Sequence, residues 1–237
     1  MSSPNLGRFR LPLRGLLIVA IATTIAAFAI VRFSPPKLAA VRSTVPDPAT
    51  DASLAAPPGS QTAVFAGGCF WGMEALFKHV KGVHSVIAGF SGGSAETAHY
   101  EQVSAGRPGH AESVKITYDP SQVSYGQLLK IFLTVAHDPT QLNQQGFDVG
   151  TQYRSAIFFT NEEQKQLAQN YISQLNQAKI FYQPIVTQIV PLNAFYAAED
   201  YHQQYVERHP HNFYVIAVEL PKIDRFQSRF PDLYRPR

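Results

Sequence analysis

The 237-residue sequence contains one cysteine, Cys69, and one tryptophan, Trp71. A single cysteine excludes any disulfide within the chain, so an oxidised Cys69 must be reduced by a thiol from another molecule. Lysine and arginine are scattered and form no basic run interleaved with aromatic residues, which argues against a nucleic-acid-binding protein. With 45% hydrophobic residues and a formal charge of +3, the composition fits one globular domain with an additional segment.

The N-terminal segment, residues 1–33, differs from the rest of the chain. Leu16–Val31 is almost wholly apolar and follows three arginines, as in a signal peptide. Ala27-Phe28-Ala29 is a candidate cleavage site, but the run is also close to the ~17 residues that just span a bilayer. We predict a signal or membrane-anchor segment and favour the anchor. We therefore expect the domain to be membrane-anchored or exported, in the periplasm or another extracytoplasmic compartment. The sequence does not determine on which side of the membrane it lies.

The remainder divides into a linker and a domain. Residues 34–60 are rich in proline, alanine, serine and threonine, which is typical of a linker, and residues 61–237 form the predicted globular domain. Apolar patterning and turn signals predict strands at Thr62–Ala66, Val83–Phe90, His110–Tyr118, Tyr153–Phe159, Ile185–Val190 and Tyr214–Leu220. Helices are predicted after Cys69, after a Ser124 cap, after a capping box of Thr160 and Glu163, and over Ala197–Val206 and Lys222–Phe230.

Cys69 lies in the segment Gly67-Gly68-Cys69-Phe70-Trp71-Gly72, between a buried strand and an amphipathic helix. Unpaired N–H groups and the positive end of the helix dipole favour an anion there, so we predict a lowered pKa and a nucleophilic thiol. A lone cysteine is also often a small buried hydrophobic residue. The flanking glycines and the adjacent aromatic pair favour a reactive thiol beside a pocket.

Glu112 begins an otherwise apolar row in the strand His110–Tyr118. Alternate residues share one face of a strand, so Glu112 lies on the same face as Val114, Ile116 and Tyr118. If that face is buried, desolvation raises the pKa of the carboxyl group and keeps it protonated, as a general acid requires. The alternative is a carboxylate at the end of the strand that turns back into water.

Six motifs occur in order along the domain and together resemble the peptide methionine sulfoxide reductase A family, which acts on the S epimer. They are Gly-Cys-Phe-Trp-Gly at 68–72, Gly-Phe-Ser-Gly-Gly at 89–93, Gly-His-Ala-Glu at 109–112, His-Asp-Pro-Thr-Gln at 137–141, Asp-Val-Gly-Thr-Gln-Tyr-Arg-Ser at 148–155 and Ala-Glu-Asp-Tyr-His-Gln at 198–203. The resemblance implies an α+β fold: a two-layer α/β sandwich with a ferredoxin-like core, extra elements and long loops.

The resemblance also implies the roles of seven residues. Cys69 is the nucleophile, Phe70 and Trp71 hold the substrate's S-methyl group, and Glu112 protonates the sulfoxide oxygen. Tyr100 and Tyr153 hydrogen-bond that oxygen, and Asp148 helps to order the site. This chemistry is intelligible, because a sulfoxide oxygen leaves poorly unless it is protonated and an apolar methyl group gains from aromatic walls.

The sequence departs from the family pattern at several positions. Many members carry resolving cysteines near the C-terminus, and this chain has none. Ser104 replaces a common cysteine, Thr97-Ala98-His99 stands where Asn-Pro-Thr is usual, and Phe90 replaces a common tyrosine. Attack by Cys69 therefore leaves a sulfenic acid that an external thiol must reduce. We expect thioredoxin or glutathione with glutaredoxin as reductant, no cofactor, no metal and a monomer that repairs oxidised proteins.

Two other classes of protein remain as alternatives. In a cysteine hydrolase, His110, His137 or His202 would act as the base for Cys69. A membrane-tethered binding module would hold a peptide against Phe70 and Trp71 without turnover. A metal site is less favoured, because neither Glu199-Asp200-Tyr201-His202 nor His209-Pro210-His211 has a recognised ligand spacing.

Overall fold

The computed structural model describes residues 44–52, 54, 59–106 and 109–237. The predicted signal or anchor segment, 1–33, and much of the predicted linker lie outside the described residues, so both stay predictions. Within the described ranges, no helix is long and apolar enough to cross a membrane.

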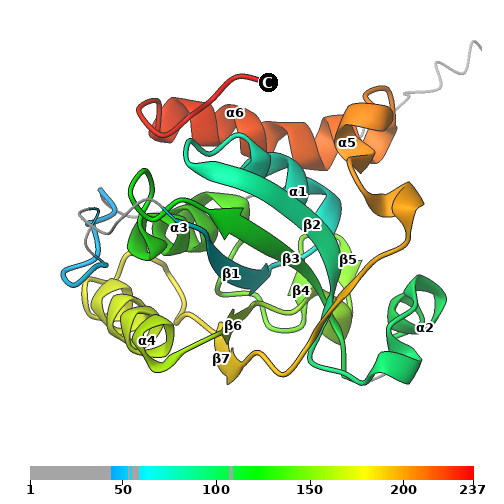
Figure 1. Ribbon diagram of the computed structural model, residues 1–237, viewed down its shortest axis with the longest axis horizontal. Coiled ribbons are helices and arrows are strands. Elements are labelled where there is room, and N and C mark those ends of the chain that lie inside the picture. The colour runs from blue at the N-terminus through cyan, green and yellow to red at the C-terminus, as the bar shows by residue number, and fades with distance from the viewer. Residues whose placement is uncertain (1–43, 53, 55–58, 107–108) are drawn as a thin grey trace, which may run out of the picture. The chain divides into compact units, whose positions relative to one another are not determined.

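A six-stranded sheet forms the centre of the domain (Figure 1). Its strands are β1 (Gln61–Ala66), β2 (Val83–Ser91), β3 (Ala111–Tyr118), β6 (Ala156–Phe159), β7 (Gln188–Pro191) and β8 (Phe195–Ala197). The order is β7-β6-β1-β3-β2-β8, and all neighbours are antiparallel except β6 and β7. The inner order β6-β1-β3-β2 is the ferredoxin-like arrangement of two βαβ units, which confirms the predicted fold class. The short pair β4 (Gln144–Gln145) and β5 (Asp148–Val149) is an additional element.

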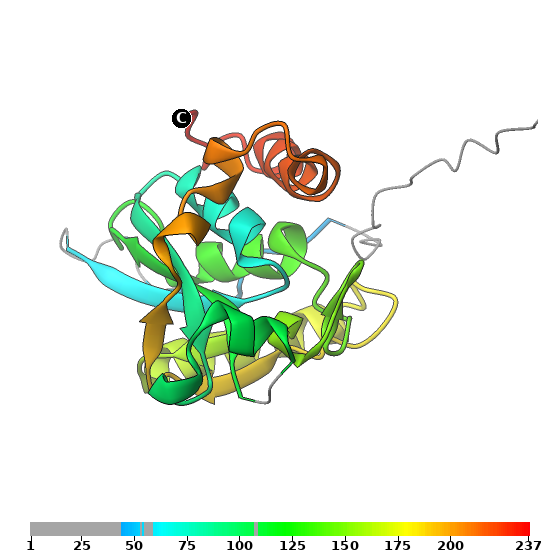
Figure 2. The same ribbon diagram turned by 90° about the vertical axis from the view of Figure 1, so that its right-hand side faces the viewer.

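Helices cover one face of this sheet. α1 (Phe70–Lys78) connects β1 to β2, and α3 (Tyr125–Ile131) lies between β3 and β6. α4 (Glu162–Gln177) crosses over from β6 to the parallel strand β7. Near the C-terminus, α6 (Leu220–Arg229) packs against α1, which therefore lies between α6 and the sheet (Figure 2).

Burial of both faces of β1 explains why its sequence is an almost uninterrupted apolar run. Ala63 and Phe65 belong to the large hydrophobic cluster shared with the helices, whereas Val64 and Ala66 belong to a smaller cluster on the opposite face. Phe65 stacks on Phe132 with ring centroids 4.6 Å apart. A central strand with apolar residues on both faces shows no alternation of polar and apolar residues.

Among the described residues of the predicted linker, the stretch 45–52 contacts the domain. The Asp51 carboxylate accepts hydrogen bonds from the Ser124 hydroxyl and, at 2.8 Å, from the Gly126 N–H at the start of α3. The Tyr171 hydroxyl of α4 donates to the Pro46 carbonyl at 2.9 Å. This stretch therefore crosses α3 and α4 as part of the packed domain.

The start of α4 differs from the prediction. Asn161, rather than Thr160, is the N-cap: its side chain accepts a hydrogen bond from the Gln164 N–H at 2.9 Å. The Gln164 side chain in turn accepts from the Thr160 N–H at 3.0 Å. The cap therefore lies one residue later than predicted, and Gln164 takes the place of Glu163. By contrast, the predicted Ser124 cap of α3 is confirmed, with Gln127 completing a capping box.

Three further predictions of secondary structure were wrong. Tyr153 lies in the 3-10 turn Thr151–Tyr153, ahead of β6. The predicted helix Ala197–Val206 is instead the end of β8, a 3-10 turn and the short helix α5 (Tyr205–Arg208). The predicted strand Tyr214–Leu220 is a π-helical turn. There, Val215 packs in a cluster with Ala75 of α1 and Val206, so tertiary packing outweighs the β-propensity of the run.

The reassigned cap can be tested by unfolding. Asn161→Ala removes the acceptor for an N–H group of the first turn of α4 and should lower the free energy of unfolding by about 1 kcal/mol. The matched control Thr160→Ala should change it by less than about 0.5 kcal/mol. Urea denaturation of the two variants measures both values. A greater loss for Thr160→Ala would show that the assignment of the cap is incorrect.

Candidate active site

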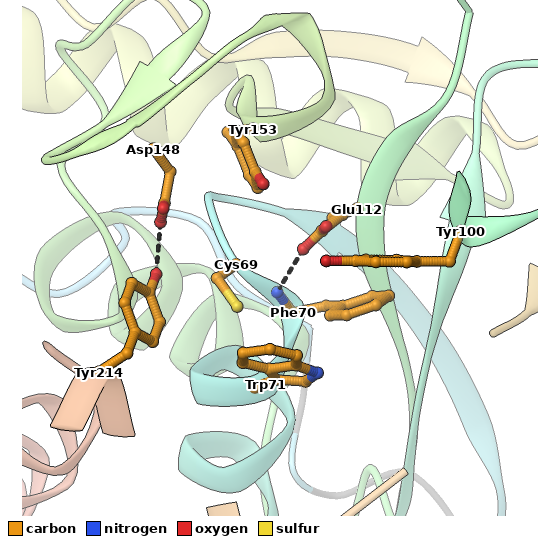
Figure 3. Close-up of a pocket in the computed structure, with 8 residues that line it drawn as sticks. All are labelled: Cys69, Phe70, Trp71, Tyr100, Glu112, Asp148, Tyr153 and Tyr214. Atoms are coloured by element: carbon orange, nitrogen blue, oxygen red, sulfur yellow. Dashed lines mark hydrogen bonds between the residues drawn. The ribbon is translucent and has the colours of Figure 1, made fainter. Parts of the chain in front are cut away.

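The seven residues proposed from the sequence line one pocket, together with Tyr214 (Figure 3). They come from separate segments of the chain: Cys69, Phe70 and Trp71 at the start of α1, Tyr100 at the start of α2 (Tyr100–Ser104), Glu112 on β3, Asp148 on β5 and Tyr153 in a 3-10 turn. The fold therefore assembles the predicted set, while the role of each residue stays a prediction.

The turn between β1 and α1 positions Cys69. Cys69 is the N-cap residue of α1, which confirms the predicted helix N-terminus. Gly68 has φ of +88°, a conformation that L-residues with a side chain rarely adopt. A Cβ at Gly67 would lie 2.8 Å from the His137 ring. The two glycines are thus required by backbone conformation and close packing, and Cys69 itself is only 7% exposed.

Glu112 is buried on the helix-covered face of β3, at 2% exposure. Its Oε2 accepts a hydrogen bond from the Phe70 N–H at 3.0 Å, which joins the carboxyl group to the first turn of α1. The pKa of Glu112 is raised to about 8: burial is the main cause, the Phe70 N–H opposes the shift, and the nearby Asp148 and Glu219 add smaller increases. Glu112 is therefore protonated near neutral pH, as the sequence predicted.

The prediction of a lowered pKa for Cys69 was wrong. Burial raises the pKa of the thiol well above its ordinary value, and the carboxyl groups of Glu219 and Glu112 raise it further. Lys222 and the Trp71 N–H favour the thiolate but do not compensate. Desolvation therefore outweighs the helix terminus, and the resting residue is an uncharged thiol.

Three tyrosines and one aspartate complete the polar side of the pocket. Burial raises the pKa of Tyr100 to about 12 and also raises the pKa of Tyr153, so both hydroxyls remain hydrogen-bond donors at neutral pH. The Tyr214 hydroxyl donates to the Asp148 carboxyl group (Figure 3). Burial also raises the pKa of Asp148.

Aromatic rings form the apolar side. Phe70 is 1% exposed and lies beside Trp71 and Tyr100, with both ring centroids 6.5 Å away. The Trp71 ring stacks on Tyr205 at 3.6 Å, and its indole N–H donates to His202 Nδ1 at 3.1 Å. Stacking and this hydrogen bond together fix the orientation of the indole ring at the edge of the pocket.

Each of the three histidines considered as hydrolase bases contacts a hydrogen-bonding group other than Cys69. His202 accepts from Trp71, and His110 contacts the Ser94 carbonyl at 2.9 Å. His137 lies between the Phe132 carbonyl and the Ser155 hydroxyl, and its burial lowers its pKa to about 4. In the segment considered as a metal site, Glu199 accepts from the Tyr100 N–H at 3.0 Å and so positions α2.

Sequence reasoning missed three residues near Cys69. Tyr214 was assigned to a strand, and Glu219 and Lys222 were not considered. Glu219 is fully buried and forms an ion pair with Lys222, with Nζ and Oε2 2.7 Å apart. One signal was present: Glu219 is the sole charged residue in the apolar run 214–220. A charge in such a run is buried only when it is paired or has a local function.

Comparison with known proteins identifies the family. The family model described as peptide methionine sulfoxide reductase matches residues 61–233. The chain belongs to the peptide methionine sulfoxide reductase family. It is 54% identical over 190 residues to peptide methionine sulfoxide reductase MsrA 2 of Synechocystis sp., covering 79% of this chain and 89% of that protein. It is 55% identical over 179 residues to MsrA 2 of Mesorhizobium japonicum, covering 76% and 92%.

A solved structure of the family agrees in fold. Methionine sulfoxide reductase A of Corynebacterium diphtheriae is 36% identical to this chain, with a TM-score of 0.57, and the match covers 71% of this chain and 84% of that one. The chain is therefore an enzyme of the MsrA type, an oxidoreductase that reduces methionine sulfoxide.

The raised pKa of Glu112 makes stability depend on pH. In the unfolded chain the carboxyl group ionises near its ordinary pKa, but in the fold it stays protonated to about pH 8. The unfolded state thus binds fewer protons between these values, so stability falls as pH rises through this window.

Glu112→Gln removes this dependence of stability on pH. The unfolding free energy of the variant minus that of the natural protein should rise from pH 5 to pH 8, by up to about 1.4 kcal/mol per pH unit. If the unfolding free energies of the variant and the natural protein differed by the same amount at every pH, the assigned pKa of Glu112 would be contradicted.

Proposed function

We propose that the chain reduces methionine-S-sulfoxide, protein-bound or free, with Cys69 as nucleophile and Glu112 as general acid. One observation carries this proposal: a buried, protonated carboxyl group is hydrogen-bonded to the helix turn that begins at the only cysteine. Family membership supports the reaction class, and the preference for the S epimer comes from the resemblance to the A family.

The chemical step transfers one oxygen atom. Glu112 gives its proton to the sulfoxide oxygen, and the Cys69 sulfur attacks the methionine sulfur as its thiolate. The proton released by the thiol restores Glu112. When the oxygen passes to the cysteine sulfur, methionine leaves and Cys69 becomes a sulfenic acid. The methionine sulfur is reduced by two electrons and the cysteine sulfur is oxidised by two.

The remaining residues of the pocket orient the substrate. The Tyr100 and Tyr153 hydroxyls donate hydrogen bonds to the sulfoxide oxygen without adding a charge. Phe70 and Trp71 contact the S-methyl group, because an apolar group gains from leaving water against aromatic rings. Asp148, which accepts a hydrogen bond from the Tyr214 hydroxyl, orders the pocket.

The catalytic cycle needs an external reductant. The sequence contains no second cysteine to condense with the sulfenic acid. A thiol of thioredoxin, or glutathione with glutaredoxin, therefore forms a mixed disulfide with Cys69 and releases water, and a second thiol then frees Cys69. The enzyme thereby repairs oxidised methionine in damaged proteins. A mixed disulfide between Cys69 and a thioredoxin lacking its second active-site cysteine would support this route, and sustained turnover without thiol would contradict it.

Turnover of the two sulfoxide epimers tests the proposed reaction. The domain from Gln61 onward, supplied with dithiothreitol, should convert peptide methionine-S-sulfoxide to methionine and leave the R epimer unchanged. Cys69→Ser should abolish this turnover, because a hydroxyl group is a far weaker nucleophile than a thiolate. Chromatographic separation of the epimers measures both outcomes.

The same assay distinguishes the alternatives. A reductase consumes thiol in proportion to the methionine formed, a hydrolase releases acid without consuming thiol, and a binding module consumes nothing. Absence of turnover for both epimers, with the protein folded and Cys69 titratable, would exclude the proposed reaction.

A further inference from the structure

Glu219 and Lys222 form a buried ion pair against the first turn of α1. Lys222 lies in α6 (Figure 1), and α1 begins at the nucleophile Cys69, which lines the pocket of Figure 3. Glu219 is fully buried, and the Lys222 side chain is 11% exposed. Among the described residues, Glu219 Oε1 has no hydrogen-bond partner. Burying a charged pair costs free energy, so stability alone does not explain why this pair lies beside a reactive thiol.

Gly72 shows how close the pair lies to the helix. A Cβ at Gly72 would overlap the Glu219 carboxylate and lie 3.2 Å from Lys222 Nζ. Only glycine lets the carboxylate occupy this place. Gly72 follows Cys69 by three residues in the turn that begins at this N-cap, so the carboxylate lies beside the first turn of the helix that carries the nucleophile.

We propose that the buried Glu219–Lys222 pair keeps the Cys69 thiol uncharged and unreactive in the resting protein, with Glu219 suppressing the thiolate and Lys222 limiting this effect. The two residues are positioning residues, since they act through Cys69. Burial also opposes the thiolate, and the other charged or titratable groups that face Cys69 are Glu112, Asp148, Tyr100, Tyr153 and Tyr214. Glu219 is the charged group with the largest effect on the pKa of Cys69.

Such suppression would protect a single-cysteine enzyme from the oxidants that create its substrate. Hydrogen peroxide reacts with thiolates: the sulfur attacks one peroxide oxygen, the O–O bond breaks, and a sulfenic acid and a hydroxide ion form, the hydroxide taking a proton from the solvent to become water. Further peroxide gives a sulfinic acid, which external thiols do not reduce. A thiol that stays uncharged in the absence of substrate avoids this loss.

Alkylation of Cys69 tests the proposal, and the single cysteine makes the signal specific. The rate with iodoacetamide is measured from pH 6 to pH 10 without sulfoxide. Glu219→Gln should lower the pKa of Cys69 by about one unit, so that alkylation at pH 7 becomes about tenfold faster. Peroxide inactivation should accelerate in parallel. The double variant Glu219→Gln with Lys222→Gln should react at a rate between those of the single variant and the natural protein.

A matched control separates electrostatics from loosening of the fold. Glu74→Gln alters a second buried carboxyl group, which lies in α1 and is paired with Lys78 at 2.7 Å, and it should leave the alkylation profile of Cys69 unchanged. An unchanged profile in Glu219→Gln, equal acceleration in Glu74→Gln, or a double variant faster than Glu219→Gln would overturn the proposal. Should Glu219→Gln not fold, the double variant, compared with Glu74→Gln, must still show faster alkylation than the natural protein.

The inference rests on Cys69 as the reacting thiol of the proposed function. Alkylation involves no sulfoxide, so its outcome is independent of the turnover assay. If Glu219→Gln showed normal turnover and unchanged alkylation, only the proposed role of the ion pair would be rejected, and the proposed reaction would stand.

Discussion

Exclusion of water from one small pocket governs the chemistry of this protein. Glu112 and Cys69 are 2% and 7% exposed, and burial is the largest cause of the raised pKa of each group. Desolvation therefore keeps both neighbouring groups protonated: Glu112 as a carboxylic acid and Cys69 as a thiol. A carboxyl group in water at neutral pH would be ionised and could not serve as a general acid.

The fold maintains this environment by bringing distant segments together. The sheet order places β3, which carries Glu112, beside β1, whose following turn begins α1 at Cys69. The β4-β5 pair and the C-terminal segment close the opposite side through Asp148 and Tyr214. In this chain the C-terminal segment contributes no cysteine. It contributes a tyrosine to the pocket and a buried ion pair beside the nucleophile.

The sequence was informative where local patterns determine structure. The apolar strand, the helix start at Cys69 and the row headed by Glu112 all follow from short-range periodicity, and the ordered motifs predicted which residues would meet. The pKa of Cys69 did not follow, because it depends on burial and on Glu219, 150 positions later. The segment Tyr214–Leu220 also misled, since a run rich in β-branched residues packs as a π-helical turn against α1. Both failures arise from tertiary contacts that no local window contains.

The most direct test of this account is a single turnover without any thiol. The protein is mixed with excess peptide methionine-S-sulfoxide and dimedone, which traps sulfenic acids; methionine is then counted and the adduct is located by mass spectrometry. One methionine per protein molecule and a dimedone adduct on Cys69 are expected, because the oxygen passes to the only cysteine. Continued methionine formation without thiol, or methionine formed without a Cys69 adduct, would contradict it.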